Sequence, residues 1–130
     1  MTYLIVFLGA GIGGALRHAI NVFTLRHYDL VAFPIATLAI NIAGSLLMGL
    51  IAGYFAFRGP DFGPAWRLFL TTGILGGFTT FSAFSLETVL LVERGSIGAA
   101  AAYVVASVAV ALIGCTAGLL LIRAGLGSPA

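Results

Sequence analysis

The chain has 130 residues, of which 61% are hydrophobic and only 8% are charged, and its mean hydropathy is +1.16. A soluble domain carries about 25% charged residues, so a globule of this composition could not cover its surface with polar groups. The composition therefore excludes a soluble enzyme. It also excludes a nucleic-acid-binding domain, because six scattered arginines without any lysine do not form a basic patch.

Uncharged runs divide the chain into segments long enough to cross a membrane, since a spanning helix needs about 20 apolar residues. The predicted spans cover about residues 3–24, 31–57, 67–91 and 96–122. Short loops join these spans, and His27 falls in one of them. Residues 1–130 are therefore predicted to form one all-α membrane domain of four transmembrane helices. Cys115 has no partner cysteine, which excludes an intrachain disulfide.

Glycines recur in pairs four residues apart within the spans. These pairs are Gly9/Gly13, Gly49/Gly53, Gly73/Gly77 and Gly114/Gly118. Such pairs let two helix backbones approach closely in lipid. They could serve packing within one subunit or contact between two subunits, and the sequence leaves both roles open.

The centre of the third span does not favour an unbroken helix. It contains the adjacent glycines Gly76 and Gly77, followed by Thr79 and Thr80. We therefore predict that this helix is broken near its middle. A break frees backbone carbonyls, which inside a membrane must be buried in protein or bind a ligand. In a two-fold dimer two such breaks would meet and could hold a small hard cation such as Na⁺. The alternative is a helix kink whose free backbone groups bind Ser or Thr hydroxyl groups and water.

The arginines divide evenly between the two sides of a four-span protein. One side holds Arg58, Arg67 and Arg123, and the other holds Arg17, Arg26 and Arg94. Orientation is normally set by an excess of Lys and Arg in cytoplasmic loops, and this chain has no excess. It is therefore predicted to insert in both orientations, so that two opposite copies could pair about an axis in the membrane plane. The alternative is a weak preference for one orientation, which would remain if Arg17 and Arg67 lie too deep in the membrane to influence insertion.

Three side chains at membrane depth are candidates for lining an ion path. Asn41 interrupts the apolar second span, and its amide could either join two helices by a hydrogen bond or donate to an anion. Phe81 and Phe84 are three residues apart and so share a helix face. Their ring edges are positive and could favour an anion without trapping it. Core packing is the alternative role of this pair.

Other polar residues could continue such a path. They are Thr37, Ser82, Ser85, Glu87, Thr88, Tyr103 and Ser107. Glu87 near the end of the third span is either a solvated terminal carboxylate or a vestibule residue, and an unpaired carboxylate there would repel anions. His18 has no second histidine at metal-binding spacing, so it is interpreted as an interfacial residue.

Several strings of residues together resemble the Fluc/CrcB fluoride channels of bacteria. These strings are Gly13-Gly14-Ala15-Leu16-Arg17, Thr37-Leu38-Ala39-Ile40-Asn41, the run from Thr72 to Ser85, Arg94-Gly95, and Tyr103 with Ser107. The resemblance extends over all four spans. It implies an antiparallel, dual-topology homodimer in the bacterial inner membrane, with two fluoride pores to which both subunits contribute.

The resemblance also implies roles for individual residues. The fluoride pore would be lined by Asn41, Phe81, Phe84 and Ser107, with the ring edges facing fluoride. A polar track or vestibule would comprise Arg17, Thr37, Ser82, Glu87, Thr88 and Tyr103. Main-chain carbonyls of Gly76 and Thr79 would hold a structural Na⁺ at the dimer interface. Two residues depart from the family's pattern: Ala83, where threonine is frequent, and His18, where an aromatic residue is common.

Three functions can be weighed on these residues. A fluoride-selective channel, which is not an enzyme, would let fluoride that accumulated as HF leave passively and so protect against its toxicity. A small multidrug-type proton-coupled exporter needs a membrane-embedded carboxylate, and only Glu87 could serve, because the first two spans contain no acidic residue. A structural membrane subunit would not need a broken third span. The sequence favours the channel.

Overall fold

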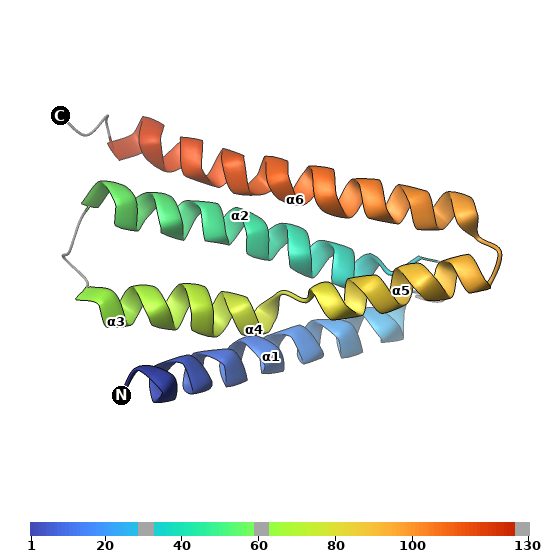
Figure 1. The fold of residues 1–130 in the computed structure, drawn as a ribbon, viewed down its shortest axis with the longest axis horizontal. Helices are drawn as coiled ribbons and strands as arrows, with labels where there is room; N and C mark the ends of the chain where they lie inside the picture. Colours follow the sequence, from blue (N-terminus) through green and yellow to red (C-terminus); the bar gives the residue numbers. More distant parts are fainter. Residues whose placement is uncertain (29–32, 59–62, 127–130) are drawn as a thin grey trace.

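The computed structural model describes residues 1–28, 33–58 and 63–126, and all regular elements in these ranges are helical. The elements are α1 (Thr2–His27), α2 (Ile35–Arg58), α3 (Gly63–Leu68), the π-helical η2 (Phe69–Leu75), α4 (Gly76–Phe78), α5 (Phe81–Glu93) and α6 (Ile97–Leu126). Together α3, η2, α4 and α5 form one interrupted crossing, so the chain traverses the bundle four times (Figure 1). The start of α1 and the end of α6 lie at the same end of the bundle.

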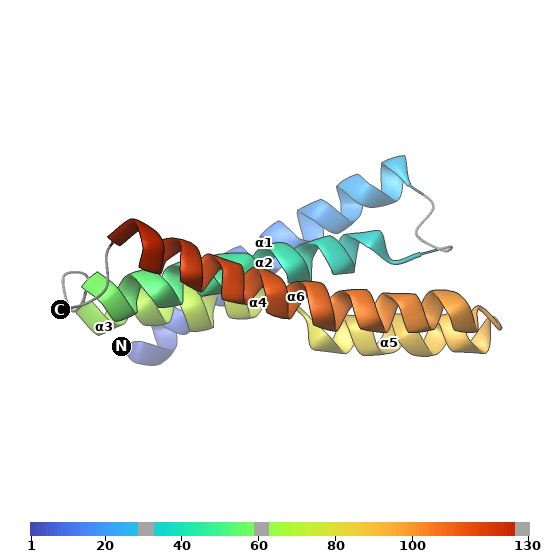
Figure 2. The same cartoon turned by 90° about the horizontal axis from the view of Figure 1, so that it is seen from above.

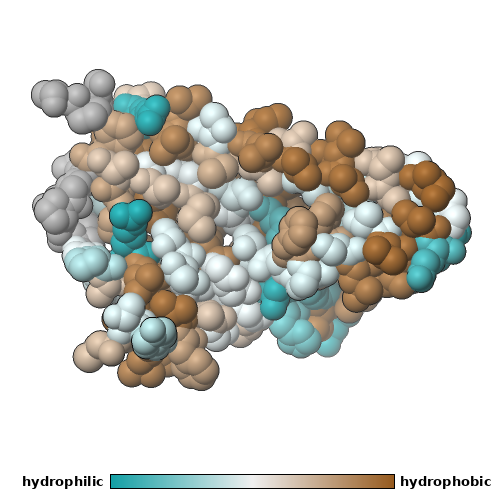
Figure 3. All heavy atoms as spheres, in the orientation of Figure 1, coloured by the Kyte–Doolittle hydropathy of each residue, from teal (hydrophilic) through white to brown (hydrophobic). Residues whose placement is uncertain are grey.

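Four helical segments are long and apolar enough to cross a membrane. They are Thr2–His27, Ile35–Phe57, Gly63–Glu93 and Ile97–Leu126. Hydrophobic side chains dominate the face shown in Figure 3, where hydrophilic residues form only small patches. The predicted all-α fold with four membrane-spanning helices and an interrupted third helix is therefore confirmed.

Some helices extend past the limits predicted from hydropathy. α1 continues to His27, which was expected in a loop but lies in the last helical turn. The third crossing begins at Gly63 rather than near residue 67, because Gly63 adopts a φ of +63° and Pro64 follows as an early helical residue. Residues 29–32, where the second span was predicted to begin, lie outside the described residues, as do 59–62 and 127–130.

α1 packs against η2 and α4 through glycines that leave no room for side chains between the backbones. A Cβ atom on Gly13 would overlap the carbonyl oxygen of Ile74, and one on Gly9 would lie 2.8 Å from the Cα atom of Gly73. Gly77 faces α1 in the same way. These glycine pairs therefore make a contact within one chain, which is one of the two roles that the sequence left open.

The same kind of contact joins α2 to α6. A Cβ atom on Gly49 would overlap the backbone carbonyl of Cys115, and one on Gly118 would lie 2.5 Å from the carbonyl oxygen of Leu46. Each of these two helix pairs is thus held at backbone distance. The walls around the centre of the bundle are correspondingly rigid, since interiors packed this closely transmit strain rather than yield to it.

The interruption of the third crossing separates two packing environments. Before it, η2 and α4 lie against α1; after it, α5 lies beside α6 while α1 diverges from α5 (Figure 2). Phe84 and Leu91 of α5 form a buried cluster with Ala100 and Tyr103 of α6. The divergence of α1 leaves space beside α5, and the polar residues described below line it.

We predict that Gly13→Ala destabilises the protein, because the new methyl group meets the backbone of η2 and cannot be accommodated by a rotamer change. Overpacking of this kind costs about 1–3 kcal/mol. Thermal unfolding in detergent should show a lowered midpoint. Gly11→Ala on the same helix is the control, because a Cβ atom there meets nothing within 4 Å. Equal midpoints for the two variants would contradict the packing described here.

Candidate functional site

The third crossing is interrupted at two threonines. The helix stops at Phe78 and restarts at Phe81. Thr79 (φ −80°, ψ 156°) and Thr80 (φ −150°, ψ 117°) between them have extended backbones. The adjacent glycines that contributed to the prediction of a break remain helical in α4. The predicted break is therefore present, just beyond the glycines.

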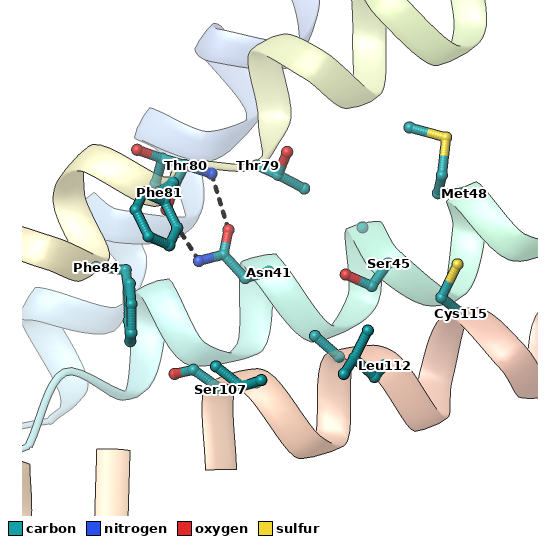
Figure 4. Close-up of a pocket in the computed structure, with 13 residues that line it drawn as sticks. Asn41, Ser45, Met48, Thr79, Thr80, Phe81, Phe84, Ser107, Leu112 and Cys115 are labelled. Carbon is teal, nitrogen blue, oxygen red and sulfur yellow. Dashed lines mark hydrogen bonds between the residues drawn. The ribbon is translucent and has the colours of Figure 1, made fainter. Parts of the chain in front are cut away.

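Side chains replace the backbone hydrogen bonds that the break removes. The Asn41 Oδ1 atom accepts from the Thr80 N–H at 2.8 Å, and its Nδ2 atom donates to the Thr80 carbonyl at 3.0 Å (Figure 4). The Thr80 hydroxyl accepts from the N–H of Ala83 at 3.2 Å and so caps α5. The Thr79 hydroxyl donates to the carbonyl of Leu75 at 2.9 Å. The break is thus held by α2 and by its own threonines.

These bonds release two carbonyl groups from helical bonding. In a continuous helix the Gly76 carbonyl would accept from the N–H of Thr80, but that N–H binds Asn41 instead. The Thr79 carbonyl would accept from the N–H of Ala83, but that N–H binds the Thr80 hydroxyl. The two carbonyls assigned to Na⁺ from the resemblance are therefore among the four, of residues 76–79, whose helical bonds the break interrupts.

A pocket of about 370 Å³ opens beside the break and is built by α2, α5, α6 and the break itself. It brings together all the residues predicted to line a fluoride pore: Asn41, Phe81, Phe84 and Ser107. The ring centroids of Phe81 and Phe84 are 5.4 Å apart. Phe84 is buried, whereas Phe81 is 77% exposed. Sequence reasoning did not find the opposite end of the lining, which includes Ser45, Met48 and Cys115.

Two polar groups in this pocket have hydrogen-bond donors without an acceptor among the described residues. The Ser107 hydroxyl is buried and has no hydrogen-bond partner among the described residues. The Asn41 Nδ2 atom carries two N–H groups, and the described residues provide an acceptor for only one of them, at Thr80. Figure 4 shows the Asn41 nitrogen and the Ser107 hydroxyl directed to the side on which the rings of Phe81 and Phe84 lie. Unpartnered donors beside phenylalanine rings form an uncharged environment suited to a small anion.

Three residues of the predicted polar track meet at Glu87. The Thr37 hydroxyl donates to its Oε1 atom at 2.7 Å, and the Tyr103 hydroxyl donates to its Oε2 atom at 2.6 Å. Glu87 is partly buried and lines a second pocket, of about 360 Å³, with Thr37. It is therefore not the solvated terminal carboxylate considered from sequence, because α2 and α6 bind both of its oxygens.

Two other residues of the predicted track lie in the space between α1 and α5. Arg17 and Ser82 line a third pocket, of about 470 Å³, together with the exposed His18. Asn21 lies between the second and third pockets and lines both. Sequence reasoning missed Asn21, although its amide within the first predicted span was a signal of the same kind as Asn41.

Thr88 is not brought into these pockets. Its hydroxyl donates to the carbonyl of Phe84, one turn earlier in α5, at 2.8 Å. Ser85 bonds in the same way to the carbonyl of Phe81, at 2.9 Å. Both hydroxyls thus donate to a backbone carbonyl of their own helix, which is common for Ser and Thr in helices.

Comparison with known proteins identifies the family. The family model described as CrcB-like protein, Camphor Resistance (CrcB), matches residues 4–119. The chain belongs to the CrcB family. The matched CrcB region includes the break, the pocket beside it and the Glu87 cluster.

Three relatives resemble this CrcB chain over almost its whole length. "Fluoride-specific ion channel FluC 2" of Nitrobacter hamburgensis is 56% identical over 123 residues, which are 95% of this chain and 98% of the relative. "Fluoride-specific ion channel FluC" of Rhodopseudomonas palustris strain BisB5 is 60% identical over 124 residues, 95% of this chain and 98% of the relative. The protein of the same name from Methylobacterium nodulans is 60% identical over 120 residues, which are 92% of this chain and 94% of the relative.

We predict that Asn41→Ala destabilises the CrcB chain, because it leaves the N–H and carbonyl of Thr80 without partners. Each buried polar group left unpaired costs about 1–3 kcal/mol. Thermal unfolding in detergent should show a lowered midpoint. Ser45→Ala is the matched control, since Ser45 lies one turn further along α2 and lines the same pocket without a hydrogen bond to Thr80. The account of the break fails if the two variants unfold at the same temperature.

Proposed function

We infer that this chain is a fluoride-specific ion channel and not an enzyme. Membership of the CrcB family and the names of relatives at 56–60% identity support this function. The structural observation that carries it is the pocket beside the break. That pocket combines the spare N–H of Asn41, the unpartnered hydroxyl of Ser107 and the rings of Phe81 and Phe84, and no charged side chain lines its described part.

These groups suit fluoride because they replace part of its hydration shell without a formal positive charge. An amide N–H and a hydroxyl donate hydrogen bonds, and phenyl edges add a weaker positive field. Conduction requires binding that is favourable enough for entry and weak enough for release. An uncharged set of donors meets both requirements, whereas a buried arginine would hold the anion too strongly.

The geometry gives less support to the proton-coupled exporter of cationic drugs. Such an exporter needs a carboxylate that is free to exchange protons for its substrate. Both oxygens of Glu87 are already bound by the hydroxyls of Thr37 and Tyr103, and Glu87 does not line the pocket beside the break. We therefore propose passive fluoride flow down its electrochemical gradient.

The chain is a multi-pass membrane protein, with four helices able to span a bilayer. We place it in the bacterial inner membrane. Fluoride that enters a cell as the neutral acid HF ionises in the less acidic cytoplasm and accumulates there. A passive channel in that membrane lets the anion leave and so protects against fluoride toxicity.

The functional unit that we propose is an antiparallel homodimer with two pores. Phe81 is 77% exposed although it lines the pocket, so a single chain leaves the pocket without one wall. A second copy, inverted about an axis in the membrane plane, would supply that wall and bring the two breaks together. The even division of arginines between the two sides supports insertion in both orientations.

A structural Na⁺ at the meeting point of the breaks is consistent with the released carbonyls. The helical donors for Gly76 and Thr79 are bound elsewhere, and carbonyl oxygens are suitable ligands for a small hard cation. Among the described residues no three His, Cys, Asp or Glu side chains gather at one place, so backbone oxygens are the appropriate donors. Two inverted chains would contribute these carbonyls symmetrically, and the ion would offset their mutual repulsion.

Liposomes containing the purified protein should release fluoride rapidly without a proton gradient, while chloride release stays at the level of empty liposomes. Ion-selective electrodes measure both ions. Phe81→Ile should slow fluoride release by roughly tenfold or more, because the ring edge is lost, while the elution volume of the assembly stays unchanged. Phe7→Ile is the matched control, since Phe7 is 73% exposed on α1 and does not line the pocket. Absent fluoride release, or equal chloride release, would refute the function.

The proposed dual topology predicts that a tag at one terminus is labelled by an impermeant reagent from both faces of the membrane. Labelling of intact spheroplasts and of inverted vesicles measures the two populations. Ser96→Lys adds a cation near Arg94 and breaks the even division of charge, so it should shift labelling toward one face. Labelling of the unmodified chain from a single face would exclude the antiparallel dimer.

A further inference from the structure

The Asn41 side chain contacts Thr80 at two points, and these contacts determine which edge of its amide faces the pocket. Oδ1 accepts from the Thr80 N–H at 2.8 Å, and Nδ2 donates to the Thr80 carbonyl at 3.0 Å. We propose that this pairing locks the amide so that the pocket meets only its remaining N–H and never its oxygen. The backbone of Thr80 is then a positioning element for anion selectivity, an inference that rests on the proposed fluoride channel.

The planar geometry of the amide supports this orientation. Its oxygen and one of its two N–H groups lie along the same edge, and the N–H and carbonyl of Thr80 bind both of them. The remaining N–H lies anti to the oxygen and so points away from Thr80. Figure 4 shows the nitrogen on the side of the Phe81 and Phe84 rings.

A half-turn of the amide about its Cβ–Cγ bond is strongly disfavoured. It would bring Nδ2 against the Thr80 N–H and Oδ1 against the Thr80 carbonyl. Two hydrogen bonds would be replaced by a donor–donor and an acceptor–acceptor contact at Thr80, which is buried. The usual ambiguity between the two ends of an asparagine amide is therefore resolved by the backbone of the break.

The peptide that locks Asn41 is itself fixed. Thr80 is buried, and its hydroxyl is bound to the N–H of Ala83 at the start of α5. Gly44 lies one turn after Asn41, and a Cβ atom there would overlap the side chain of Thr79. α2 is thus seated directly on the break, so the backbone of α2 and the backbone of Thr80 are held next to each other.

The lock has a consequence for the choice of ion. An amide that is free to turn offers an oxygen to cations and an N–H to anions. The locked amide offers the pocket only an N–H. The unpartnered Ser107 hydroxyl offers it an O–H when its proton points into the pocket. Selection for an anion then follows from a hydrogen-bonded backbone and needs no charged residue.

Side-chain amide NMR tests the lock on the full-length chain. Asn21 and Asn41 are the only asparagines, so ¹⁵N-asparagine labelling gives two NH₂ groups, and Asn21→Gln assigns them. One Asn41 proton should exchange with deuterium roughly tenfold more slowly than the Asn21 protons, because it is bound to the Thr80 carbonyl. The other Asn41 proton should shift on titration with sodium fluoride and not with sodium chloride.

Each other outcome has a defined meaning. Equal exchange of the Asn41 and Asn21 protons overturns the lock. A fluoride-dependent shift of the protected proton overturns it as well, because the amide must then have turned. Protection without any response to fluoride overturns the role of the remaining N–H. A wild-type chain that releases no fluoride from liposomes contradicts the proposed function itself, whereas unprotected Asn41 protons in a chain that does release fluoride contradict only the lock.

Discussion

The pairing between the Asn41 amide and the backbone of Thr80 is the contact on which the centre of the molecule depends. The interior of a membrane offers no water to unpaired backbone groups, so an interrupted helix persists there only if other groups satisfy it. One side chain supplies both a donor and an acceptor to the break. The same contact aims the spare N–H of Asn41 at the pocket and deprives the Gly76 carbonyl of its helical donor. The break, the pocket beside it and the release of the Gly76 carbonyl therefore all involve this one interaction.

Glycine packing supplies the rigidity that this interaction requires. α1 meets η2 and α4 at backbone distance through Gly9 and Gly13, and α2 meets α6 in the same way through Gly49 and Gly118. A small anion is recognised only if its donors hold their positions, because loose walls would also accept larger anions with their water. The glycines that make the spans unusual in sequence thus hold the helices around the pocket at backbone distance.

Much of this organisation could be predicted from the sequence, because uncharged runs define spans and consecutive Gly and Thr residues disfavour helix. The position of the break could not, because Gly77 stays helical where α1 must approach closely and the extended residues follow it. Nor could the partner of Asn41 be identified, since Thr80 is 39 positions away and the contact depends on how α2 sits on the break. The state of Glu87 was equally inaccessible, because its two partners lie on other helices. The grouping of the pore residues followed from the family resemblance rather than from their spacing.

We propose that the pocket with its amide N–H, hydroxyl and two phenyl rings conducts a small anion passively, without a formal charge. The reversal potential of the current through the wild-type protein in a planar bilayer tests this claim most directly. With fluoride unequal across the bilayer and chloride and pH equal, the account predicts a shift of about 59 mV for each tenfold fluoride gradient. It also predicts no shift when only the chloride or the proton gradient is changed. A reversal potential that follows chloride or protons would contradict the account.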